Sequence, residues 1–248
     1  MIYITGDIHG GLDIEKLSNK QFPAGKNLTG KDYVVICGDF GLPFLSTDMA
    51  KPEEFIPNKY ARQAQKTYQY WIKWLSQRPF TVLWVDGNHD NHPFWYQQPV
   101  TEWNGGLVNR HPDAENVIHL KRGEYYKIDG ATFWVMGGAA SHDKEYRTPG
   151  YSWWEEEIPS QGEMMHGRET LQAHGNQVDY ILTHTMPQHL LAPVLGTYYP
   201  PERTRSYLDE IYLETTFQKW FCGHFHVDVD KPVYRMQVLY QNVVQLTE

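Results

Sequence analysis

The sequence has few cysteines and no long apolar run. Cys37 and Cys222 are too few for a disulfide framework and lack metal-type spacing, so we interpret them as free thiols in a reducing cytosol. No stretch approaches the roughly 20 apolar residues of a membrane span. Residues 1–25 lack the basic segment and apolar core of a signal peptide. We therefore expect a cytoplasmic protein that has no membrane partner.

Positive charge is also scarce. The formal net charge is −8 at pH 7, which disfavours an extended nucleic-acid or anionic-membrane surface. It does not exclude a small anionic substrate, because a bound metal ion reverses the local charge. Internal repeats and low-complexity tracts are absent as well. We expect one domain over residues 1–248.

Short apolar runs alternate with longer amphipathic segments. Buried strands are predicted at residues 1–5, 32–37, 80–85, 116–120, 124–128, 132–137, 179–183 and 219–223. Helices are predicted near residues 12–20, 59–77, 162–174 and 202–216. Gly-bearing turns between the three central strands suggest hairpins, and residues 232–246 suggest a terminal strand or hairpin. The longest irregular stretches are 40–58, 86–116 and 139–161. This alternation predicts an α/β sandwich of two sheets with helices outside.

Residues with metal-ligating side chains follow five of the predicted strands. They lie in the stretches GDIHG, GDF, GNHD, LTH and GHFH. Because ligands gather at the carboxyl ends of strands in α/β folds, we expect the five stretches to converge on one site. The candidate residues are Asp7, His9, Asp39, Asn88, His89, Asp90, His184, His224 and His226.

The side chains in this set indicate a pair of metal ions. Carboxylate oxygen together with imidazole nitrogen suits Mn²⁺, Fe or Zn²⁺. The ligands are too many for one tetrahedral Zn²⁺ and match two ions that share a bridging carboxylate. Two ions about 3.5–4 Å apart can hold a bridging water, lower its pKa and clamp a phosphoryl group for in-line attack. Each stretch alone is typical of a turn or a structural histidine, so the prediction depends on all five.

In this order the five stretches resemble the motif set of the calcineurin-like metallophosphoesterases, and they run from residue 6 to residue 226. The resemblance implies a four-layer α/β/β/α sandwich of the metallophosphoesterase type with two divalent metal ions. It also implies how the ligands divide: Asp7, His9 and His226 hold the first ion, Asn88, His184 and His224 hold the second, and Asp39 bridges the two.

His89 and Asp90 are the candidate catalytic residues. In the family that GNHD resembles, its histidine faces the substrate, stabilises phosphoryl oxygens and can protonate the leaving group. Asp90 either orients His89 or raises its pKa, or it only forms the turn. The resemblance implies a hydrolase of small phosphorylated substrates, either a phosphomonoesterase or a phosphodiesterase. A non-catalytic scaffold with this fold is the alternative, but it should lack some of these residues.

The first stretch, GDIHG, resembles the protein Ser/Thr phosphatases, but the second stretch differs from them. Those enzymes have an arginine in GDxVDRG, whereas residues 38–43 are GDFGLP, which argues against a protein phosphatase. Residues 137–154 can supply the missing positive charge, and they resemble a segment of small bacterial and phage-encoded relatives. We expect a loop near the metal ions, with Arg147 or His142 touching substrate. The alternative is a surface loop that its aromatic side chains pin in place.

Overall fold

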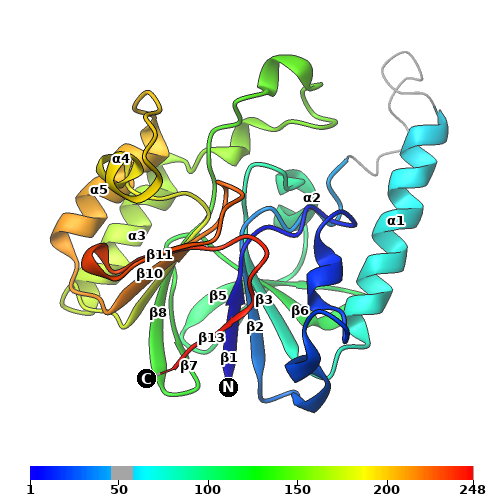
Figure 1. Cartoon of the computed structure of the whole chain (residues 1–248). Helices are drawn as coiled ribbons and strands as arrows, with labels where there is room; N and C mark the ends of the chain where they lie inside the picture. Colours follow the sequence, from blue (N-terminus) through cyan, green and yellow to red (C-terminus); the bar gives the residue numbers. More distant parts are fainter. Residues whose placement is uncertain (46–57, 248) are drawn as a thin grey trace.

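The structure is a computed structural model that describes residues 1–45 and 58–247. Within these ranges the strands form two sheets (Figure 1). The strands of the first sheet are β1 (Ile2–Thr5), β2 (Tyr33–Cys37), β3 (Thr81–Val85), β4 (Val100–Trp103), β5 (Gly106–His111), β6 (Ala114–Leu120) and β13 (Val244–Gln245). Those of the second are β7 (Tyr125–Ile128), β8 (Ala131–Met136), β9 (Tyr180–Thr183), β10 (Lys219–Cys222), β11 (Val229–Lys231) and β12 (Met236–Val238).

The strand order sets where the loops meet. It is β13-β1-β2-β3-β6-β5-β4 in the first sheet and β11-β12-β10-β9-β8-β7 in the second. Strands β1, β2 and β3 run parallel to one another, and so do β8, β9 and β10. Parallel neighbours end at the same edge of a sheet. The loops that follow these strands therefore share one end of the molecule, the upper end in Figure 1.

Helices cover the outer faces of both sheets. The α-helices of the described residues are α1 (Asn58–Ser76), α2 (His92–Tyr96), α3 (Gln161–Ala173), α4 (Leu191–Leu195) and α5 (Arg203–Glu214). Short 3₁₀ helices lie at Ile14–Leu17, Pro23–Asn27, Lys144–Tyr146, Glu155–Glu157, Gln188–Leu190 and Pro232–Tyr234. In Figure 1, α1 flanks one sheet while α3, α4 and α5 flank the other. No described helix is long and apolar enough to cross a membrane.

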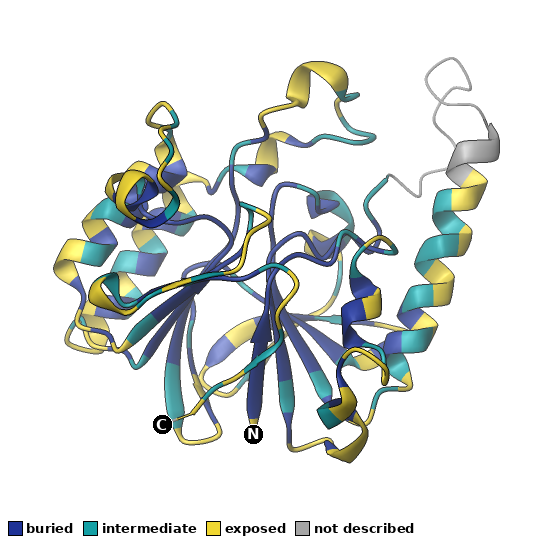
Figure 2. Ribbon diagram, in the orientation of Figure 1, coloured by how far each residue is buried: buried dark blue, intermediate teal, exposed yellow. Residues whose placement is uncertain are grey.

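Three apolar clusters hold these layers together. The middle cluster lies between the sheets and contains Ile4, Val35 and Leu83 of the first sheet with Leu182 and Phe221 of the second. The two outer clusters join the first sheet to α1 and the second sheet to α3 and α5. Figure 2 shows the central strands buried and the outer helix faces exposed. The predicted four-layer α/β/β/α sandwich is confirmed.

Some local predictions were wrong. The segment 12–20 forms only the 3₁₀ turn Ile14–Leu17. Strands β6 and β7 are not a hairpin, because the chain crosses between them from the first sheet to the second. The stretch 86–116, expected to be irregular, contains α2 and the hairpin β4–β5, whose turn is the Asn104-Gly105 pair with positive φ at both residues. Of the stretch 40–58, residues 46–57 lie outside the described residues.

The terminal segment, predicted to be a strand or a hairpin, contains two strands that do not pair with each other. Strand β12 joins the second sheet beside β10, whereas β13 pairs antiparallel with β1 in the first sheet. The last described residues therefore connect the two sheets. The hairpin predicted for β7 and β8 is confirmed.

The buried face of α5 gives a matched test of the outer layer. Leu208 is fully buried on this helix, whereas Leu213 on the same helix is 78% exposed. We expect Leu208→Ala to lower the free energy of unfolding by about 2–5 kcal/mol, because it removes buried methyl groups and leaves a cavity. Leu213→Ala should change it by less than about 0.5 kcal/mol. Urea unfolding of both variants measures the difference, and equal effects would contradict this packing.

Candidate metal centre

The predicted site residues follow strands that end at one edge of the molecule. Strand β1 precedes Asp7 and His9, and β2 precedes Asp39. Strand β3 leads into the GNHD stretch, β9 ends just before His184, and β10 leads into the GHFH stretch. The backbone joins these loops, since His9 N donates to Asp39 O at 2.9 Å and Gly223 N donates to His184 O at 2.9 Å.

One group of these side chains can hold a cation. Asp7, His9, Asp39 and His226 each offer one ligand atom, and these four atoms lie within 4.8 Å of one another. His9 Nε2 lies 3.3 Å from Asp39 Oδ2, and His226 Nε2 lies 3.3 Å from Asp7 Oδ2. These carboxylate oxygens and imidazole nitrogens therefore face a common point.

A second group adjoins the first and is centred on His184. Its Nε2 lies 3.1 Å from Asn88 Oδ1, 3.2 Å from His224 Nδ1 and 3.3 Å from Asp39 Oδ1. Asp39 is thus common to both groups, with Oδ2 toward His9 and Oδ1 toward His184. One carboxylate that faces two groups of donors suits a pair of cations.

Hydrogen bonds from the second ring nitrogen orient two of the imidazoles. His9 Nδ1 lies 2.7 Å from Asp13 Oδ2, and His184 Nδ1 lies 3.0 Å from the carbonyl oxygen of Cys37. An Nδ1–H that donates to such an acceptor leaves Nε2 as the basic nitrogen. In both residues Nε2 is the atom that faces Asp39.

The backbone adopts unfavourable conformations at these positions. Four of the seven predicted ligands have positive φ: His9 (41°), Asp39 (45°), His224 (70°) and His226 (52°). Only a few per cent of non-glycine residues do so, and such residues cluster at functional sites. The fold therefore holds these side chains in place against local backbone preference.

Two glycines leave space that the site needs. A Cβ on Gly38 would lie 1.9 Å from His184 Nδ1, and the φ of Gly38 is +94°. A Cβ on Gly223 would lie 2.1 Å from Asp7 Oδ1. Any larger residue would push the side chain of a predicted ligand out of place. The space and the donor set together fit divalent cations.

The buried carboxylates shift the titration of the histidines. Burial alone would lower the pKa of His9, but hydrogen bonding to Asp39 and the charges of Asp39 and Asp7 raise it to about 9. His184 is buried as well, yet the charges of Asp39 and Asp7 raise its pKa to about 10. The pKa of Asp39 is held well below its usual value despite burial, chiefly by the charge of His184. Without cations, protons on the imidazoles offset the carboxylates.

His89 and Asp90 have different surroundings. The His89 backbone N–H donates to Asp39 Oδ1 at 2.7 Å, and burial lowers the pKa of its imidazole. Asp90 is completely buried, and its carboxylate accepts the backbone N–H groups of Phe40, Gly41 and Gly87. These bonds join the loops that follow β2 and β3.

The predicted loop at residues 137–154 reaches this site. Arg147 Nη2 donates to His89 Nε2 at 2.6 Å, and Nη1 donates to the Asn88 carbonyl oxygen at 3.3 Å. Asp143 pairs with the same guanidinium at 2.6 Å. The ring of His142 lies 6.1 Å from that of His224. Both predicted substrate-contacting side chains therefore lie beside predicted ligands.

Sequence patterns missed the residues that support the first group. Lys16 is buried, and its ammonium donates to the carbonyl oxygens of Gly6, Asp7 and Tyr240. The ring of Tyr240 stacks on His226 at 4.8 Å, and its hydroxyl donates to Asp13 Oδ1 at 3.1 Å. Asp13 lies four residues after His9. This spacing indicates a contact only within a helix, so the sequence does not predict their hydrogen bond.

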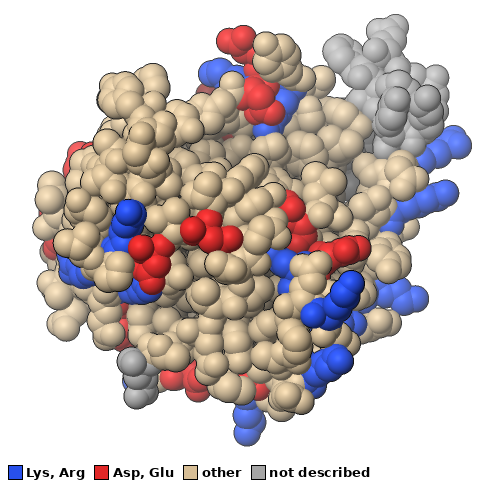
Figure 3. All heavy atoms as spheres, viewed as in Figure 1, with Lys and Arg blue, Asp and Glu red and all other residues tan. Residues whose placement is uncertain are grey.

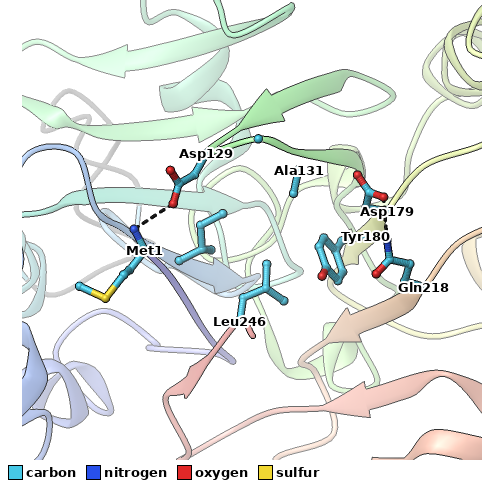
Figure 4. Close-up of a pocket in the computed structure, with 9 residues that line it drawn as sticks. Met1, Asp129, Ala131, Asp179, Tyr180, Gln218 and Leu246 are labelled. Atoms are coloured by element: carbon cyan, nitrogen blue, oxygen red, sulfur yellow. Dashed lines mark hydrogen bonds and ion pairs between the residues drawn. The ribbon is translucent and has the colours of Figure 1, made fainter. Parts of the chain in front are cut away.

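Two cavities differ in their relation to the site. One, of about 500 Å³, lies at the opposite end of the sheets, where Asp129 pairs with the amino group of Met1 and Asp179 accepts from Gln218 (Figure 4). The other, of about 470 Å³, is bordered by His9 and has the aromatic walls Phe44 and Trp71. Only the second cavity adjoins the candidate metal centre.

Comparison with known proteins agrees with this geometry. A family model described as calcineurin-like phosphoesterase matches residues 1–228. This range includes every predicted ligand and ends before Tyr240. No curated protein matches the chain.

The raised histidine pKa values predict how the metal-free protein responds to pH. Protonated His9 stabilises the fold fully below its ordinary pKa of 6.5, and this contribution is lost as the pH rises through about 9. Because His184 loses its proton at about pH 10, the free energy of unfolding in urea, with a chelator present, should fall between about pH 6.5 and 10. Asp39→Asn removes the opposing charge and should flatten this dependence. An equally steep fall in the variant would contradict the assignment.

Proposed function

The chain belongs to the calcineurin-like phosphoesterase family, and we propose that it hydrolyses phosphate esters with two divalent cations held by Asp39 and the two groups of ligands around it. The first cation would be held by Asp7, His9 and His226, and the second by Asn88, His184 and His224. The position of Asp39 carries the proposal, because its two oxygens lie 3.3 Å from His9 Nε2 and from His184 Nε2. The mixed oxygen and nitrogen donors suit Mn²⁺, Fe or Zn²⁺.

Cations bound there would lower the pKa of a water molecule and offset charge on the phosphoryl oxygens. His89 and Arg147 lie beside the ligands and are the groups we propose to contact the substrate. The negative charge of an incoming phosphoryl group would raise the pKa of His89, which burial lowers in the free protein. The protonated imidazole can then stabilise phosphoryl oxygens and protonate the leaving alkoxide.

Asp90 has a positioning role in this proposal. Its carboxylate accepts three backbone N–H groups of the loops that follow β2 and β3. Those loops carry Asp39, Asn88 and His89. These bonds favour the turn-forming alternative, in which Asp90 keeps the loops in register and touches no substrate.

A small phosphorylated substrate suits the surroundings of the site. Figure 3 shows acidic and basic side chains mixed over the face in view, in keeping with the net charge of −8. Arg147 supplies positive charge beside His89, and the cavity bordered by His9 has room for a leaving group with apolar parts.

The proposal is tested by reconstituting the chain with Mn²⁺, Fe²⁺ or Zn²⁺, counting bound metal and assaying p-nitrophenyl phosphate and its bis ester. We expect two ions per chain and turnover of at least one ester. His89→Gln should keep both ions while kcat falls by about 10²–10⁴-fold, because it removes the proton donor. Fewer than one ion per chain with no turnover would refute the proposal, and an unchanged kcat in His89→Gln would refute the mechanism.

Arg147 should affect catalysis separately from metal binding. We expect Arg147→Ala to lower kcat/KM about tenfold or more, since a charged hydrogen bond to the phosphoryl group is lost. Lys144→Ala, an exposed cation in the same loop, is the matched control and should have little effect. A fall of less than threefold for Arg147→Ala, at full metal content, would remove Arg147 from the proposed mechanism.

A further inference from the structure

A buried chain of hydrogen bonds leads from Asn88 away from the candidate metal centre. Asn88 Nδ2 donates to Ser141 Oγ at 3.2 Å, and Ser141 Oγ donates to Glu157 Oε2 at 2.5 Å. The backbone N–H of Ser141 donates to the other carboxylate oxygen, Oε1, at 2.8 Å. All three residues are buried, and neither Ser141 nor Glu157 belongs to the five stretches that predict the site.

The order of donors and acceptors along these hydrogen bonds determines the orientation of the Asn88 amide. An ionised carboxylate only accepts hydrogen bonds, so Glu157 takes the hydroxyl hydrogen of Ser141. The lone pairs of that hydroxyl then face Asn88 and accept from an N–H group. The amide nitrogen of Asn88 must turn toward Ser141, and its oxygen turns toward His184 Nε2 at 3.1 Å.

The reverse orientation of the amide would not bind a cation. An Asn side chain presents an acceptor oxygen on one end and a donor NH₂ on the other, and only the oxygen can be a metal ligand. Both ends have nearly the same shape, so packing alone does not select between them. A hydrogen-bond partner must do so.

Gly138 and Ala139, at the start of the loop 137–154, hold Glu157 in place beside Ser141. The carbonyl oxygen of Glu157 accepts the N–H of Ala139 at 3.1 Å, and a Cβ on Gly138 would lie 2.5 Å from the same oxygen. Glu157 ends the short 3₁₀ helix Glu155–Glu157, which follows the loop that carries Arg147. Hydrogen bonds between Ser141 and Glu157 therefore join the start of this loop to the residues that follow it.

We propose that Ser141 and Glu157 are positioning residues that set the orientation of the Asn88 amide and thereby form the second cation site. This inference rests on the proposed function, in which Asn88 is a ligand of that cation. The loop then has a role besides placing Arg147 and His142 near the site. Ser141 and Glu157 determine which atom of the Asn88 amide faces the cation.

The test measures metal affinity and not only activity. Metal-free wild-type protein is titrated with Mn²⁺ by calorimetry, where two binding events are expected. Ser141→Ala and Glu157→Gln should weaken one event by about 10–100-fold, as loss of an outer hydrogen-bond partner does, and leave the other nearly unchanged. Ser141→Thr keeps the hydroxyl and should restore most of the affinity.

Matched controls come from the same region. Ser152 Oγ accepts the N–H of Thr148 at 3.0 Å within the loop, and Glu156 is an exposed neighbour of Glu157. Ser152→Ala and Glu156→Gln should bind both ions as the wild type does. Their thermal unfolding, compared with that of Ser141→Ala, separates a general loss of structure from a change at one cation site.

The possible results distinguish this inference from the proposed function. A wild-type chain that binds no metal would overturn both. Two ions in the wild type, with equal affinities in Ser141→Ala and Glu157→Gln, would overturn the positioning role alone. Equal weakening of both binding events would also overturn it, because the pair would then support the whole site and not the Asn88 amide.

Discussion

The structure depends on the placement of two buried carboxylates, Asp7 and Asp39, at the ends of adjacent parallel strands. Buried negative charges need positive charge nearby. In the metal-free protein, the protonated imidazoles of His9 and His184 supply it. In the proposed function, the same side chains help to hold the cations that supply it. The neighbouring features follow from this requirement. They include the glycines that leave room for the side chains, the left-handed backbone at four predicted ligands, and Lys16, which bonds the backbone of the first loop.

The two sheets contribute different residues to the site around these carboxylates. The first sheet supplies Asp7, His9, Asp39 and Asn88 from three parallel strands, and the second supplies the histidines that follow β9 and β10. The apolar cluster between the sheets sets their distance. Asp39 lies where the two contributions meet, so the packing of the sandwich and the geometry of the site cannot change independently.

The layers and the convergence of strand ends could be predicted because they follow from local signals: buried β-rich runs, helical periodicity, and polar residues just after strands. Contacts between distant residues could not. Nothing near Asn88 in the sequence indicates Ser141 or Glu157, and Tyr240 lies outside the range of the family model. The crossing between β6 and β7 was missed because a short turn between strands looks the same whether they share a sheet or not.

Strand β13 beside β1 brings Gln245 opposite Tyr3, and Tyr240 reaches His226 and Lys16 from the same segment. Contacts between residues so far apart along the chain close very large loops and slow folding. His9 meets Asp13 and Asp39, which are close to it in sequence, whereas His226 and Tyr240 contact Asp7 and Asp13 from more than 200 residues further along. The first group of predicted ligands and the edge of the first sheet therefore depend on the same terminal segment, and a change that loosens this segment would disturb both.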